Sequence, residues 1–167
     1  MLTNMDKLYE SVAANGPVCV GLDTEISYLP TTDTAKTAGE NVVAFNRALI
    51  DATKGVAGCY KVQIAYYESL GLDGMRAYAE TLNDCASQLS GTKVYSMVIP
   101  NHSEFGVPER VRNYYEEASQ RENTMAVNNT LSASITAVDI YDALNLHNNE
   151  DIYFDTDTHW APLGAFY

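Results

Sequence analysis

Asp157 and His159 stand two residues apart near the end of the sequence, with Thr158 between them. At this spacing a carboxylate can orient an imidazole and stabilise its cation while the ring takes a proton from a serine. Ser96 and Ser103 are candidate nucleophiles, but neither lies in a Gly-x-Ser-x-Gly pattern, so we do not expect either to complete a triad. The Asp157–His159 pair therefore indicates acyl-ester chemistry, but the sequence does not identify the nucleophile.

The same loop also contains Asp155, so Asp155, Asp157 and His159 have a second interpretation as metal ligands. Two or three acids and one histidine in a terminal loop are a weak signal for a metal ion. We therefore expect a solvated loop that holds neither a metal nor a cofactor. His102 and His147 have no evident partner in the sequence, and we expect both on the surface.

Alternating strands and helices must position these side chains. Strand patterns occur near residues 18–23, 59–66, 93–99 and 135–141. The first of these has the pattern of a buried strand. Helical periodicity separates the strands, and one helix has a predicted apolar face at Val42, Phe45, Leu49 and Ala52. Strands separated by helices need crossovers, so we expect an α/β fold, mainly parallel, as an incomplete barrel or a three-layer sandwich in one compact unit.

The 167-residue chain has a formal net charge of −12, from 22 acidic and 10 basic side chains. This charge repels phosphate backbones and anionic lipids, so we expect neither nucleic-acid nor membrane partners. A basic protein is the partner that the charge would attract, and open sheet edges would favour self-association. No signal peptide or long apolar run is visible, so we expect a cytoplasmic protein with Cys19, Cys59 and Cys85 as reduced core thiols.

Four segments in the first half form a specific combination, at residues 20–30, 44–53, 60–68 and 71–78. Over about residues 5–82 the chain resembles the opening of a bacterial orotidine 5'-phosphate decarboxylase, which implies the first two β/α units of a barrel. The resemblance implies that Asp23 contacts the ribose of the substrate. It also implies that Lys61 belongs to a charged Lys-Asp-Lys-Asp network at the carboxylate that is lost.

The rest of that network is missing from the sequence. In the family an Asp-x-Lys-x-x-Asp motif follows the third strand, and its lysine protonates the carbanion left by carbon dioxide. Residues 98–105 contain no such motif. Decarboxylation without a covalent cofactor depends on preorganised charges and a positioned proton donor. We therefore expect Asp23 and Lys61 to be remnants, with poor affinity for a small-molecule substrate and no turnover.

A different combination follows, at residues 94–100, 104–108, 138–144, 152–160 and 164–167. Over about residues 78–167 the chain resembles the DHHW protein family, which is similar to the SGNH-like acyltransferases that acetylate alginate. The namesake motif falls on residues 157–160, with Thr158 in place of the first histidine. In those relatives the nucleophilic serine and the oxyanion hole lie further along the chain, so the resemblance makes Asp157 and His159 part of an incomplete site.

The two resemblances overlap at residues 78–83, within one predicted helix. We therefore hypothesise a chimera, with a decarboxylase-like βαβα fragment at residues 1–83 and a DHHW-like fragment at residues 84–167. The favoured function is a non-catalytic protein that carries partial sites of two enzyme families. Three alternatives remain: a decarboxylase of pyrimidine biosynthesis, an SGNH-like acyl-ester hydrolase or O-acetyltransferase, and an acidic protein that binds a basic partner.

Overall fold

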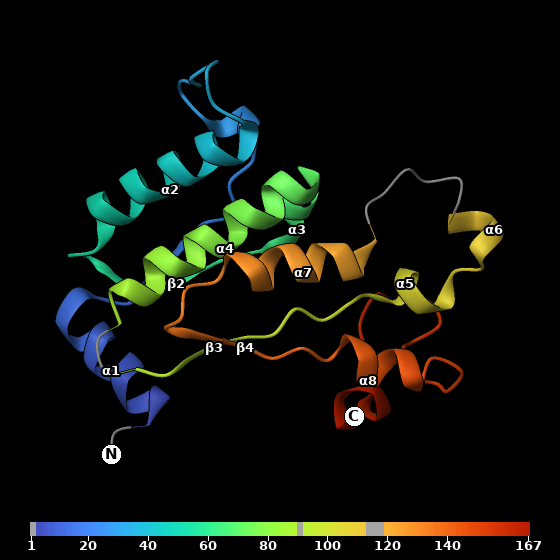
Figure 1. The fold of residues 1–167 in the computed structure, drawn as a ribbon. Helices are drawn as coiled ribbons and strands as arrows, with labels where there is room; N and C mark the ends of the chain where they lie inside the picture. The colour runs from blue at the N-terminus through green and yellow to red at the C-terminus, as the bar shows by residue number, and fades with distance from the viewer. Residues whose placement is uncertain (1–2, 90–91, 113–118) are drawn as a thin grey trace. The chain divides into compact units, whose positions relative to one another are not determined.

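The computed structural model describes residues 3–89, 92–112 and 119–167. The chain divides into two compact units, Met1–Cys85 and Ala86–Tyr167 (Figure 1). Each unit contains one two-stranded parallel sheet with helices around it. Among the described residues, no helix is both long enough and apolar enough to span a membrane.

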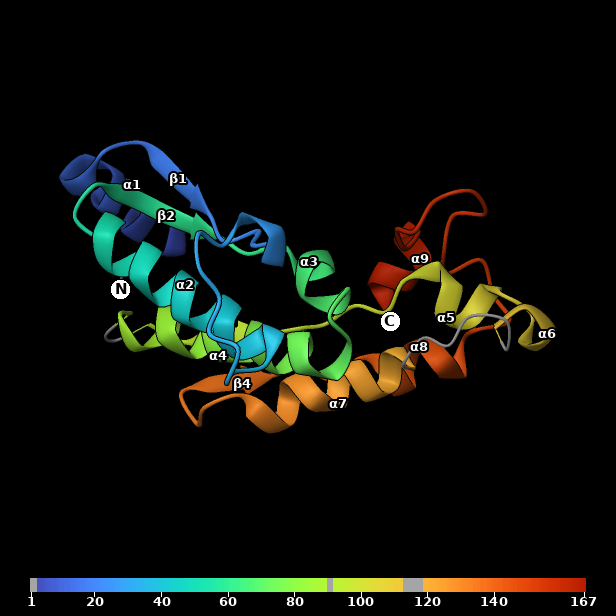
Figure 2. The ribbon, with the colours of Figure 1, turned by 90° about the horizontal axis from the view of Figure 1, so that it is seen from above.

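The first unit is built around a strand–helix–strand crossover. Its elements are α1 (Asn4–Asn15), β1 (Val18–Gly21), the 3-10 helix η1 (Ile26–Tyr28), α2 (Ala38–Thr53), β2 (Ala57–Lys61), α3 (Ile64–Glu68) and α4 (Gly71–Ser87). β1 and β2 are parallel, and α2 connects them, as a parallel pair requires. The two strands run side by side in Figure 2, with α2 beneath them.

One irregularity sets the register of the β1–β2 pair. Val18 pairs with Ala57, whereas the next residue, Cys19, pairs with Cys59. Gly58 is therefore an extra residue in β2, which makes this position a β-bulge. Beyond the bulge the pairing continues without a further shift to the end of both strands.

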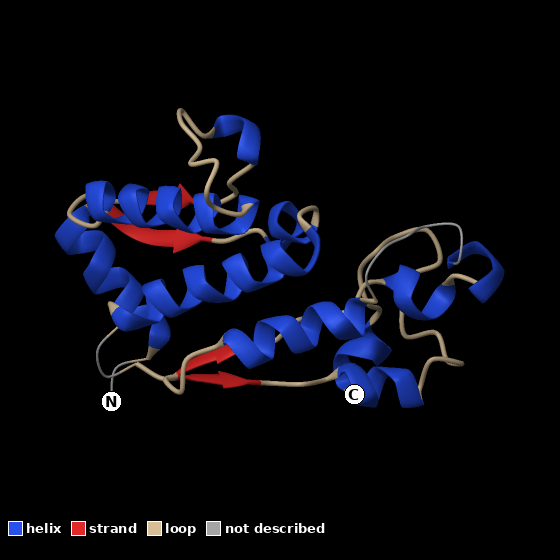
Figure 3. Cartoon of the chain, turned by 45° about the horizontal axis from the view of Figure 1, so that its top comes forward, coloured by secondary structure: helices blue, strands red, loops and turns tan. Residues whose placement is uncertain are grey.

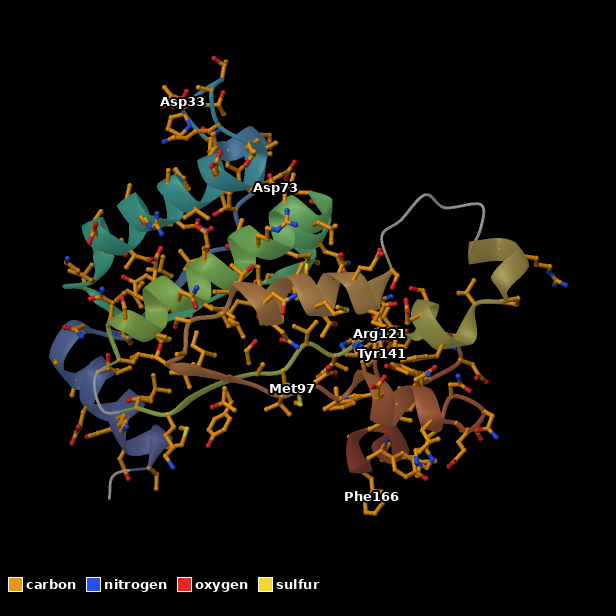
Figure 4. All side chains as sticks on the ribbon, viewed as in Figure 1. Asp33, Asp73, Met97, Arg121, Tyr141 and Phe166 are labelled. Atoms are coloured by element: carbon orange, nitrogen blue, oxygen red, sulfur yellow. The ribbon has the colours of Figure 1, made fainter. Side chains whose placement is uncertain are left out.

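Two sets of hydrogen bonds stabilise the N-terminus of α2. Thr37 and Glu40 form a capping box, in which each side chain accepts a hydrogen bond from the other residue's backbone N–H. Asp73, in the first turn of α4, accepts from the Gly39 N–H over 2.6 Å and from the Thr37 hydroxyl over 3.0 Å (Figure 4). A Cβ on Gly39 would lie 2.7 Å from the Asp73 carbonyl oxygen, so glycine allows this close approach.

The core of the first unit lies between α2, α3 and α4, and the face that α2 buries differs from the predicted one. Ala52, expected on the apolar face, is exposed, and Asn46 is buried. Asn46 is hydrogen-bonded to Thr24, Tyr67 and Thr81, and a hydrophobic pattern does not register such buried polar partners. The buried core cluster consists of Val42, Val43, Tyr67 and Ala77.

The predicted fold class is confirmed, because the structure is α/β with four parallel strands flanked by helices. The strands form two separate pairs, and the described residues close no barrel. The strand expected at 59–66 ends at Lys61, and residues 64–68 form α3. β1 ends at Gly21, so residues beyond Lys61 lack a partner strand for a ladder. The helical turn instead places Tyr67 fully inside the core.

The prediction of a buried first strand is wrong. Val18 is 52% exposed, and Cys19 is also exposed. Among the described residues β1 pairs only with β2, so its outer edge has no neighbouring strand and an apolar run alone does not guarantee burial. The cysteines were also expected in the core, but Cys59 and Cys85 are only half-buried.

The second unit also contains a parallel pair. Its elements are β3 (Val94–Ser96), α5 (His102–Gly106), α6 (Glu109–Arg112), α7 (Gln120–Thr130), β4 (Ile135–Ala137), α8 (Tyr141–Leu146) and α9 (Pro162–Phe166). Val94 pairs with Ile135, and α7 lies along the β3–β4 pair in Figure 3. A buried cluster of Leu144, Ile152 and Tyr153 packs against the partly buried Trp160.

Candidate functional site

Asp23 and Lys61 meet at the carboxyl ends of β1 and β2. Gly21 pairs with Lys61 in the register, and Asp23 follows Gly21 by two residues. Lys61 Nζ lies 3.3 Å from Asp23 Oδ2, and the lysine and aspartate side chains are 53% and 33% exposed. An ion pair this open to solvent contributes little to stability. The structure thus brings Asp23 and Lys61 together and leaves both side chains accessible to solvent.

The other carboxylate oxygen of Asp23 has a different environment. Oδ1 is buried and accepts no hydrogen bond from the described residues. A buried oxygen without a donor is costly, so a ligand hydroxyl or a water that donates to it would be favoured there. Asp23 has the chemistry to hold a hydroxyl group, and the neighbouring Lys61 ammonium has the chemistry to bind an anion.

A buried polar network holds the residues on both sides of Asp23. The Tyr67 hydroxyl donates to the Leu22 carbonyl over 2.6 Å, and Asn46 Nδ2 donates to the Tyr67 oxygen over 2.9 Å. The Thr24 hydroxyl donates to Asn46 Oδ1 over 2.6 Å. Burial raises the pKa of Tyr67 to about 12, against the lowering effect of its hydrogen bonds. The neutral phenol therefore remains a donor in this network at neutral pH.

The polar side chains of the segment that follows β3 form hydrogen bonds within the second unit. Glu104 is buried, and its carboxylate accepts hydrogen bonds from the Tyr141 hydroxyl and the Gln120 backbone N–H. Asn101 caps α5 by accepting from the Ser103 N–H over 2.9 Å. Sequence analysis missed this cluster, although Asn101 at the start of a short helix is a recognisable N-cap signal.

Arg121 and Tyr141 extend the same cluster toward the surface. The Arg121 guanidinium carbon lies 4.8 Å from the centre of the Tyr141 ring, and Figure 4 shows the two side chains together. Arg121 also pairs with Asp142, which raises the pKa of the arginine and lowers the pKa of the aspartate, in both cases mainly through their hydrogen bond. These contacts tie the starts of α7 and α8 together.

Asp157 and His159 form the second predicted pair, in the loop between Tyr153 and Trp160. His159 Nδ1 lies 2.6 Å from Asp157 Oδ1, and the His159 backbone N–H donates to the same oxygen over 3.0 Å. The side-chain hydrogen bond is the main reason why the pKa of Asp157 is lowered. The His159 side chain is 79% exposed, so the oriented imidazole faces solvent.

The two candidate serines are held elsewhere in the second unit. Ser103 Oγ donates to Asn101 Oδ1 over 2.6 Å, and Ser96 is buried within β3. Among the described residues, no serine is hydrogen-bonded to the His159 ring. The structure therefore brings Asp157 and His159 together without placing either candidate serine beside them.

Two other histidines differ from expectation. His147 was expected without a partner, but its Nδ1 lies 2.7 Å from Glu150 Oε1 and its ring stacks on Tyr167, with centroids 3.6 Å apart. His102 stacks on Tyr153. Glu150 is only three residues from His147, so this partner was within reach of sequence inspection, whereas Tyr167 and Tyr153 meet the two histidine rings only through the fold. Within the part of the chain that is described, no three His, Cys, Asp or Glu side chains are grouped to hold a metal ion.

Comparison with known proteins gives two kinds of similarity. The chain is 54% identical over 82 residues to an orotidine 5'-phosphate decarboxylase from Clostridium kluyveri, which covers 47% of this chain and 28% of that protein. A decarboxylase from Clostridium perfringens is 54% identical over 80 residues, with the same coverage of both chains. The chain thus spans only 28% of the length of these curated relatives.

The second similarity is to DHHW proteins. A crystal structure of a DHHW family protein from Eubacterium siraeum is 38% identical, with a TM-score of 0.49, over 56% of this chain and 30% of that one. The model of the family described as DHHW protein matches residues 6–167. The match begins well before residue 78, so the range expected from the sequence motifs was too short. The chain belongs to the DHHW protein family.

Proposed function

We propose that the chain is a non-catalytic member of the DHHW family that carries partial sites of two enzyme families. In this proposal residues 1–83 derive from a decarboxylase-like fragment and residues 84–167 from a DHHW fragment. The identity of 54% to proteins named orotidine 5'-phosphate decarboxylase, confined to 47% of the chain, supports the first assignment. The DHHW-like segments from residue 94 onward support the second assignment, and they lie within a family match that itself begins at residue 6.

The observation that carries the proposal is the open Asp23–Lys61 pair. Lys61 has one carboxylate neighbour at 3.3 Å and a half-exposed side chain. Electrostatic catalysis depends on several preorganised charges in a site that excludes water. A single solvated ion pair can help to bind a hydroxylated anion, but it does not provide a shielded proton donor for a carbanion.

Loss of orotidine monophosphate, followed by its ultraviolet absorbance, tests this proposal directly. We expect the wild-type protein and Lys61→Ala to give the same rate as buffer alone. Arg76→Ala, which removes a charge from the exposed side of α4, serves as a matched control for the change in net charge. A wild-type rate above that of Lys61→Ala, with Arg76→Ala unchanged, would show that the protein is a decarboxylase.

A second candidate function is acyl-ester hydrolysis, which the 2.6 Å contact between Asp157 and His159 favours. In this function the carboxylate orients the imidazole, which takes a proton from a serine or from water. An activated acetyl ester is the substrate for the test. Turnover that disappears in both His159→Ala and Ser103→Ala would establish this function. Turnover that persists in both variants would exclude it.

A further inference from the structure

Cys19 and Cys59 lie directly opposite each other in the parallel β1–β2 pair. Backbones of neighbouring strands are about 4.8 Å apart, and disulfides join residues whose Cα atoms are about 4.4–6.8 Å apart. Paired residues in a sheet point to the same face. Both thiols are free, with Cys19 exposed and Cys59 half-buried. The backbone thus places two reactive groups within bridging range on one face.

The face can be identified from the neighbouring residue. The Tyr60 hydroxyl lies 2.9 Å from Thr53 Oγ1 and donates to the Ile50 carbonyl over 3.2 Å, so Tyr60 points toward α2. Successive side chains of a strand point to opposite faces. Cys59 therefore points to the face away from α2, where Cys19 is open to solvent.

The β-bulge is what aligns the two cysteines. Without the extra residue Gly58, the pairing that starts at Val18 would place Cys19 opposite Gly58 instead of Cys59. Ser11 of α1 donates a hydrogen bond to the Gly58 carbonyl over 2.8 Å. A Cβ on Gly58 would lie 2.5 Å from the Gly16 carbonyl oxygen and 2.9 Å from Val12 Cγ2, so the bulge packs tightly against the C-terminal end of α1. The pairing of the thiols is therefore a built feature of the unit.

We propose that Cys19 and Cys59 form a reversible dithiol–disulfide site that reacts with low-molecular-weight disulfides. The exposed Cys19 thiolate attacks one sulfur of glutathione disulfide, and the first glutathione thiolate leaves. Cys59 then attacks the Cys19 sulfur of the mixed disulfide, and the second glutathione thiolate leaves. Two cysteine thiols are oxidised and one glutathione disulfide is reduced, and the two protons pass to the departing glutathione.

The interaction between the thiols agrees with this geometry. The pKa of Cys59 is raised, first by a hydrogen bond with the Cys19 side chain and then by partial burial and the charge of Cys19. A bridge between adjacent strands falls within the usual Cα range of disulfides.

Exposure of the native protein to excess glutathione disulfide, followed by mass spectrometry of the intact chain and of its peptides, tests the proposal. We expect a loss of two hydrogen atoms, one peptide pair linked through Cys19 and Cys59, and a free thiol at Cys85. Dithiothreitol should restore all three thiols. A lasting glutathione adduct on wild-type Cys19, a disulfide-linked dimer or unreacted thiols would each overturn the proposal.

Single variants separate the two steps. Cys59→Ser should accumulate the glutathione adduct at Cys19, because the second thiol is missing. Cys85→Ser is the matched control and should form the internal bridge as the wild type does. If a variant fails to fold, the experiment on the wild-type protein still tests the proposal.

Discussion

Asn46 donates a hydrogen bond to the Tyr67 hydroxyl over 2.9 Å, and both side chains are buried. Through this contact α2 holds the hydroxyl that in turn binds the Leu22 carbonyl at the end of β1. The Asn46 and Tyr67 side chains thus hold the backbone immediately before Asp23.

Tyr67→Phe tests the contribution of this network to stability. The change leaves the buried Leu22 carbonyl without its 2.6 Å donor, and an unsatisfied buried group costs about 1–3 kcal/mol. We expect the free energy of unfolding in urea to fall by about that amount. The adjacent Tyr66→Phe is the matched control, since Tyr66 is 37% exposed, and it should change stability by less than about 0.5 kcal/mol. If both variants changed the free energy of unfolding equally, the Tyr67–Leu22 hydrogen bond would not be the source of the loss.

Alkaline pH should weaken both units. Burial raises the pKa of Tyr67 and of Tyr153 to about 12, from an ordinary value of 10.0. Between these values the unfolded chain loses the protons first, so stability is full below pH 10 and declines toward pH 12. Each phenol adds a slope of at most about 1.4 kcal/mol per pH unit. Urea unfolding at a series of alkaline pH values should show a smaller slope in Tyr67→Phe or Tyr153→Phe.

Gly39→Ala should disrupt the contact between α2 and α4. The new Cβ would lie 2.7 Å from the backbone oxygen of Asp73, which cannot move as a flexible side chain would. We expect a loss of about 1–3 kcal/mol in the free energy of unfolding. Gly55→Ala, at a position with no heavy atom within 4 Å of the new Cβ, is the control and should leave stability unchanged or slightly higher. A neutral Gly39→Ala would show that the helices can separate without cost.

The Asp157–His159 contact predicts a change in titration. The hydrogen bond from His159 lowers the pKa of Asp157, so His159→Ala should raise that pKa toward its ordinary value of 3.8. The stabilising effect of the pair is present above the ordinary pKa and is lost as pH falls through the lowered one. NMR titration of the Asp157 carboxyl carbon measures the change. An unchanged pKa would mean that the pair does not form in solution.

The sequence predicted the alternation of strands and helices because that signal is local. It did not predict where the strands end, because a ladder needs a partner, and β1 stops at Gly21 opposite Lys61. The buried position of Asn46 was also missed, since its burial depends on Tyr67 and Thr81 from other helices. Hydrogen bonds between residues far apart in the sequence are not visible in a hydrophobic pattern.

The residues of each candidate pair could be named from the sequence because they occupy fixed positions in a motif. Asp157 and His159 lie close together because only one residue separates them. Asp23 and Lys61 were named from family resemblance, and their 3.3 Å contact depends on the parallel register. The His147–Glu150 pair spans only three residues and could have been predicted, whereas the stacking of Tyr167 on the His147 ring depends on the fold.

The β-bulge at Gly58 limits how this part of the chain can evolve. Removing one residue between Gly58 and Lys61 would turn every later side chain of β2 to the opposite side, and the ammonium would leave its carboxylate. A substitution in β2 changes one side chain, whereas an insertion or deletion changes the orientation of every side chain that follows it. Natural variants of β2 should therefore differ in side chains and agree in length.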